Sequence, residues 1–97
     1  MEDIAQKLNI SIEELEDGIK QNLIYYGVED FDEKEQLPLF ILARVRDLNS
    51  DEFNMYKIGS YYSIVYKDKQ ESILFDESFY DNLFKFLDNE KLNYKLK

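Results

Sequence analysis

The sequence predicts a single α+β domain over residues 1–97, with an N-terminal helical hairpin, a three-stranded antiparallel β-meander and a C-terminal amphipathic helix. Apolar residues recur every three or four positions near both ends of the chain, which is the period of a helix. Between them the run MYKIGSYYSIVYK alternates in polarity and is rich in tyrosine and β-branched residues, as strands are. The chain has 97 residues, of which 44% are apolar, and this is enough for one core without disulfides.

The first expected element is a short helix over residues 2–8. Its inward-facing residues are Ile4, Ala5 and Leu8. After a break at residues 9–10, Ser11 and Glu14 form the S-x-x-E pattern of a capping box. A second helix is therefore expected to begin at this point.

The second helix carries one apolar stripe and is expected to stop at Gly27. The stripe consists of Ile12, Leu15, Ile19 and Leu23. Gly18 lies inside this helix, where it costs about 1 kcal/mol relative to alanine unless a neighbouring side chain packs closely against it.

The region after this hairpin fits two different structures. Residues 28–36 are expected to form an acidic connection, and Pro38 restricts the chain that follows it. As a strand, residues 39–48 place Leu39, Ile41, Ala43 and Val45 on one face; as a helix, a stripe would contain Leu37, Ile41, Val45 and Leu48. The β-branched residues and the strand pattern that follows favour the strand.

Residues 55–67 have the clearest strand pattern in the chain. A β-bulge is expected at Gly59. The residues expected to share one face are Tyr56, Ile58, Tyr62, Ile64 and Tyr66. A hairpin connection at residues 67–70 then leads to a strand over residues 71–75, which completes the meander.

A helix beginning at Asp76 or Ser78 and reaching Asp88 is expected next. Its apolar arc of about 160° is wider than contact with one sheet face requires. The outer half of the arc consists of Tyr80, Phe84 and Leu87. We expect either that the N-terminal helices cover these residues or that they form a homodimer or partner surface. The alternating tail, residues 92–97, suggests a short edge strand.

Several classes of function lack the residues that they need. The chain has no cysteine and no histidine, so it lacks thiolate and imidazole ligands and the usual general base near neutral pH. Neither a glycine-rich phosphate loop nor a nucleophile motif is present. Asp30 and Asp32 match the first two ligand positions of an EF-hand loop, but Lys34 occupies the third. We therefore expect no enzyme activity, cofactor or specific metal site.

Sequence features also indicate the compartment. The longest apolar run, residues 37–43, is too short to cross a bilayer, and the acidic N-terminus differs from a secretory signal. Together with the absence of cysteine, these features predict a cytoplasmic protein that binds no membrane.

The negative charge is concentrated in the first third of the chain. Residues 1–36 hold eleven acidic residues and three lysines, which is a net charge of -8 out of -9 for the whole chain. Such a region attracts basic protein surfaces, although it also serves solubility alone. The predicted function is a protein-binding module, such as a stoichiometric inhibitor or immunity-type protein that engages a basic surface. The carboxylates expected to bind are Glu13, Glu14, Asp17, Glu29, Asp30, Asp32 and Glu33, with Tyr25, Tyr26 and Phe31 as apolar anchors.

Residues 4–23 resemble a helix-turn-helix. The resemblance lies in Ala5, residues 9–11, Leu15 and Ile19, which have the spacing that such motifs use to pack two helices. It implies a transcriptional regulator. However, the second helix would present Glu13, Glu14 and Asp17 to the phosphates of DNA, which repels them.

The tyrosines of residues 56–66 and the basic residues near them in the sequence are the other candidate for nucleic-acid binding, by base stacking. A structural role is favoured for these tyrosines because Tyr is a common strand residue. Direct nucleic-acid binding is therefore not expected, and a helix-turn-helix-like regulator and a structural homo-oligomer remain the alternatives.

Overall fold

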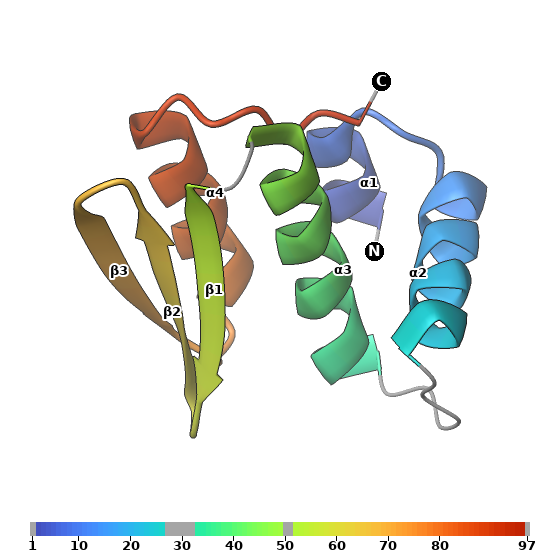
Figure 1. Cartoon of the computed structure of the whole chain (residues 1–97). Coiled ribbons are helices and arrows are strands. Elements are labelled where there is room, and N and C mark those ends of the chain that lie inside the picture. The colour runs from blue at the N-terminus through green and yellow to red at the C-terminus, as the bar shows by residue number, and fades with distance from the viewer. Residues whose placement is uncertain (1, 27–32, 50–51, 97) are drawn as a thin grey trace. The chain divides into compact units, whose positions relative to one another are not determined.

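A computed structural model of the chain describes residues 2–26, 33–49 and 52–96. Within these residues it contains, in order, α1 (Glu2–Leu8), α2 (Ile12–Tyr26), α3 (Glu33–Asn49), β1 (Phe53–Ile58), β2 (Tyr61–Tyr66), β3 (Lys69–Leu74) and α4 (Phe79–Asn89), as shown in Figure 1. The predicted α+β class, with N-terminal helices, a β-meander and a C-terminal helix, is confirmed. The chain divides into two compact units, Met1–Arg44 with Tyr94–Lys97 and Val45–Asn93. The expectation of a single domain stays a prediction.

In the first unit, α1 and α2 follow the sequence closely. Ile4, Ala5 and Leu8 of α1 are all buried. The capping box forms at the start of α2: the Glu14 N–H donates to Ser11 Oγ at 3.1 Å, and the Ser11 N–H donates to Glu14 Oε1 at 3.3 Å. Two backbone N–H groups that the helix leaves unpaired are thereby satisfied.

The apolar stripe of α2 is buried at its centre. Leu15 and Ile19 are fully buried, whereas Ile12 is 39% exposed. The side chain of Leu23 and the expected stop at Gly27 lie outside the described part of the chain.

Gly18 allows α3 to pack against α2. A Cβ atom built on Gly18 would lie 2.7 Å from Cζ and 2.8 Å from Cε2 of Phe40 in α3. The Phe40 ring is 2% exposed, and the Arg44 guanidinium lies 5.5 Å from its centroid. The expected cost of a glycine inside α2 is therefore offset by the ring that packs in its place.

The strand predicted over residues 39–48 is wrong, because these residues belong to α3. As a strand, this segment would point Phe40 and Leu42 away from the face that holds Ile41. In α3 all three side chains are buried. A helix that is apolar on several sides is stable once neighbouring elements cover it, and local sequence cannot show this. The expected connection also ends earlier, since α3 begins at Glu33 and contains Pro38.

The sheet of the second unit is an antiparallel meander with the strand order β1-β2-β3. The single strand predicted over residues 55–67 is wrong: Gly59 and Ser60 form a two-residue turn, and Ile58 pairs with Tyr61. Gly59 has φ of +57° and Ser60 does not have a positive φ, which matches the φ pattern of a type II′ hairpin turn. The expected bulge at Gly59 is therefore a chain reversal.

This reversal divides the predicted tyrosine face between the two sides of the sheet. Residues that pair directly share a face, so Tyr62 shares its face with Lys57 and Ile73. Tyr56 and Ile58 lie on the opposite face and are exposed. The α4 side of the sheet carries the aromatic contacts, with the rings of Tyr62 and Phe79 5.7 Å apart.

The C-terminal helix is confirmed, but the expected edge strand in the tail is wrong. Residues 92–96 have no strand structure. Leu92 and Tyr94 are buried, which accounts for the alternation in the sequence. In the first unit, the Leu96 N–H donates to the Leu8 carbonyl at 2.9 Å.

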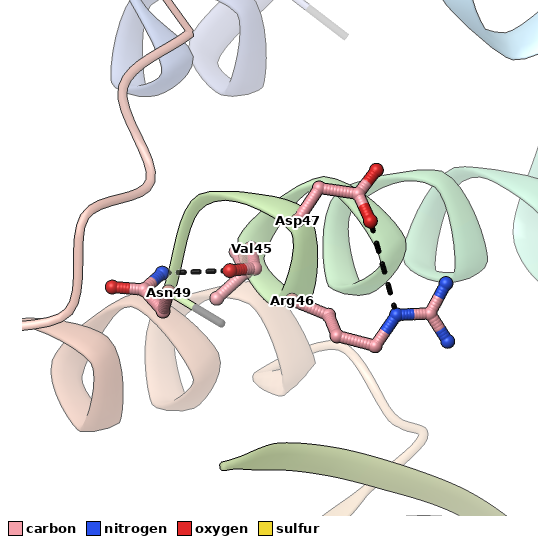
Figure 2. Close-up of polar contacts among 4 residues, drawn as sticks. All are labelled: Val45, Arg46, Asp47 and Asn49. Carbon is pink, nitrogen blue, oxygen red and sulfur yellow. Dashed lines mark hydrogen bonds and ion pairs between the residues drawn. The ribbon is translucent and has the colours of Figure 1, made fainter. Parts of the chain in front are cut away.

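Asn49 joins the last turn of α3 to the segment after α4 within the second unit. Its Nδ2 group donates to the Val45 carbonyl at 2.6 Å, as Figure 2 shows, and to the Asn93 carbonyl at 2.8 Å. Its Oδ1 accepts the Asn93 N–H at 2.9 Å. The neighbouring Arg46–Asp47 pair in Figure 2 is 3.9 Å apart and solvent-exposed, so it contributes little.

We predict that Gly18→Ala destabilises the protein by about 1–3 kcal/mol, although alanine favours helices, because the new methyl group meets the Phe40 ring. Urea unfolding of the variant and the wild type measures this difference. In a Phe40→Leu background the same substitution costs less, because the ring is absent. A Gly18→Ala protein more stable than the wild type contradicts the close packing.

We predict that Asn49→Ala lowers the free energy of unfolding by about 1–3 kcal/mol, because three hydrogen bonds to backbone groups are lost. Asn49→Asp rescues at most one of the three bonds, since a carboxylate still accepts the Asn93 N–H but cannot donate to the Val45 and Asn93 carbonyls. Asn93→Ala is the matched control, because only the backbone of Asn93 takes part. Equal stability of the Asn49→Ala and Asn93→Ala proteins argues against this role.

Candidate functional site

The first candidate site is the exposed side of the first two turns of α2, which we name the α2 acidic face. It consists of Glu13, Glu14, Glu16 and Asp17, all exposed. The buried side chains of Leu15 and Ile19 fix this helix in the first unit. The apolar residues of α2 recur with the helical period, so its apolar side chains lie on the buried side and its carboxylates on the exposed side.

The structure locates only part of the predicted partner-binding set. Glu13, Glu14 and Asp17 lie together on the α2 acidic face. Tyr25 and Tyr26 belong to the last turn of α2 and Glu33 begins α3, but the side chains of these three lie outside the described residues, as do Glu29, Asp30, Phe31 and Asp32 entirely. Their roles stay predictions.

The basic and aromatic residues of the sheet do not form one surface. Tyr62 is buried, and Tyr56 is exposed on the opposite face. Lys57 and Lys69 share the face of Tyr62, and Lys69 pairs with Glu90 at 3.0 Å. Among the paired residues of β1, β2 and β3, the face that carries the exposed Tyr56 ring holds no lysine or arginine, whereas nucleic-acid stacking platforms combine aromatic rings with cations.

The predicted homodimer residues of α4 have little exposed area. Phe84 and Leu87 are buried, and Tyr80 is half-buried. A second copy binds to side chains that solvent reaches, so these positions offer it little. The homodimer through them stays a prediction.

A cleft of about 500 Å³ beside β3 is a site that the sequence did not indicate. It lies between β3 and α4, within the second unit. Its lining residues are Glu71, Ser72, Ile73, Leu74, Asp76, Ser78, Asn82, Lys85, Phe86 and Asn89. Sequence reasoning missed it because the lining depends on which edge of the sheet α4 lies against. The lining combines charged and polar side chains with the apolar residues Ile73, Leu74 and Phe86.

A small polar network fixes the end of the cleft where α4 begins. The Ser78 hydroxyl and N–H both donate to Asp76 Oδ1, at 2.7 and 2.9 Å. Asn82 Nδ2 donates to Ser78 Oγ at 3.1 Å. These hydrogen bonds lower the pKa of the Asp76 carboxyl below its ordinary value of 3.8. The bond from the Ser78 hydroxyl has the larger effect, and the bond from the Ser78 N–H has the smaller one.

Within residues 2–26, 33–49 and 52–96 no cluster of three or more acidic side chains is arranged to hold a metal ion. Across the same ranges, every helix is too short or too polar to span a bilayer. No known protein family, characterised protein or solved structure matches this chain.

We predict that the carboxyl of Asp76 titrates below pH 3.8 and that Ser78→Ala raises its pKa, because the variant loses the hydroxyl that donates to the carboxylate. Since folding lowers this pKa, its stabilising effect is present above the unfolded value and is lost as the pH falls through the folded one. An NMR pH titration of the carboxyl carbon measures both values. An unchanged pKa in Ser78→Ala contradicts the assignment.

Proposed function

We propose that the protein is a small protein-binding module that engages a basic surface of its partner through the α2 acidic face. One observation carries this proposal. Four carboxylate side chains are exposed on two successive turns of a helix whose opposite side is fully buried at Leu15 and Ile19. Such a helix presents its charges from a fixed backbone.

Preorganisation is the physical advantage of this arrangement. The capping box closes the N-terminus of α2, and its Glu14 carboxylate accepts the Ser11 N–H at 3.3 Å. Less backbone freedom is then lost when the partner binds. Complementary charge also accelerates association and excludes partners of like charge.

The chemistry of this face sets the class of partner. Its carboxylates repel phosphate, so a basic protein surface suits it better than DNA or RNA. A basic groove that normally holds nucleic acid is one such surface, which makes a stoichiometric inhibitor of immunity type the specific form of the proposal. Binding of this kind needs no cofactor and no catalytic group, and we place it in the cytoplasm because the chain has no cysteine.

The test compares two variants of equal net charge. The first is the triple variant Glu13→Gln, Glu16→Gln and Asp17→Asn, which neutralises the α2 acidic face. The second neutralises three exposed residues elsewhere, with Glu52→Gln, Glu77→Gln and Asp81→Asn. Both remove three negative charges. Tagged proteins capture partners from lysate of the native host, and captured proteins and nucleic acid are quantified.

We expect the wild type and the second variant to retain one basic protein that the α2 variant loses. Its capture falls at high salt, because the attraction is between exposed charges. If both variants lose the basic protein equally, net charge alone explains its capture, which contradicts a role for the α2 acidic face. Recovery of nucleic acid without a basic protein also contradicts the proposal. Circular dichroism confirms that both variants fold.

A further inference from the structure

Two buried amide atoms in the first unit have no hydrogen-bond partner among the described residues. They are Nδ2 of Asn22 in α2 and Oε1 of Gln36 in α3. The first is a donor and the second an acceptor. Most buried polar atoms in folded proteins are hydrogen-bonded, because an unpaired one loses its hydration without compensation. These two atoms therefore mark a place where the closed packing is unfavourable.

The packing of α2 against α3 places the two amides beside each other. Phe40 of α3 packs against Gly18 of α2, where a Cβ atom would lie 2.7 Å from the ring. The two helices run in opposite directions, as Figure 1 shows. Asn22 comes one turn after Gly18, and Gln36 comes one turn before Phe40. Residues four apart share a helix face, so Asn22 and Gln36 lie at the same level on facing sides.

The two ends of this helix pair differ in their packing. Leu15, Ile19 and Phe40 are fully buried or nearly so around the Gly18 contact. Toward the end of α2, the side chain of Ile24 is 79% exposed and contributes little packing. The end that holds Asn22 therefore carries an unfavourable polar contribution that the Gly18 end lacks.

We propose that α2 and α3 open locally at Asn22 and Gln36 while Phe40 stays packed against Gly18. Opening lets water hydrate Asn22 Nδ2 and Gln36 Oε1, which recovers the free energy lost by burying them without partners. The apolar side chains around Gly18 lose free energy on exposure to water, so they stop the opening there. Such a local opening needs less free energy than global unfolding does.

Amide hydrogen exchange of the whole chain, followed by NMR, tests this opening. In the wild type, the amides of residues 23–26 are expected to exchange faster than those of Ile19 and Leu42, which lie in the closed part. Asn22→Leu and Gln36→Met each replace an amide by an apolar group of similar size. Each is expected to slow exchange at residues 23–26 at least about tenfold, because the closed state no longer buries that unpaired atom.

The Gln36→Met protein separates this opening from fraying of α2 alone. Its substitution lies in α3, so slower exchange at residues 23–26 shows that the two helices open together. Gln21→Leu is the matched control, because it adds an apolar side chain at an exposed position of α2 without removing a buried atom. It should leave these exchange rates unchanged.

Faster exchange in Asn22→Leu or Gln36→Met overturns the proposal, because the amide would then stabilise the closed packing. Unchanged exchange at residues 23–26 in Gln36→Met also overturns it, as does wild-type exchange there that is as slow as at Ile19 and Leu42. None of these outcomes depends on partner capture by the α2 acidic face.

Discussion

The register of the three-stranded sheet is the constraint on which the surfaces of the second unit depend. Two-residue turns at residues 59–60 and 67–68 set it, and in each turn the first residue has a positive φ, +57° at both Gly59 and Lys67. A slip of one residue would exchange every side chain between the two faces. It would expose Tyr62 and Ile73. The core therefore follows from the same two turns.

Polar contacts lie near both ends of α4. Asp76 and Ser78 join at its start, and Lys69 pairs with Glu90 just after its end. The aromatic rings of Phe75 and Phe79 also pack together, with their centroids 5.3 Å apart.

The charge of the α2 acidic face sets how its proposed binding responds to solution conditions. The α2 acidic face favours a basic partner through long-range attraction, which salt screens.

The sequence alone determined the elements whose signals are local. The capping box at Ser11 and Glu14, the inward side of α1 and the helical period of α4 each depend on residues within a few positions of one another. Only the tertiary structure decided that residues 39–48 are helical, because their apolar pattern fits both periods and burial from several sides selects the helix. It also decided that the chain reverses at Gly59, since a glycine serves a bulge and a turn equally well until a paired strand fixes its φ. The β3 cleft was beyond sequence reasoning for the same reason: it exists only once the strand order and the place of α4 are set.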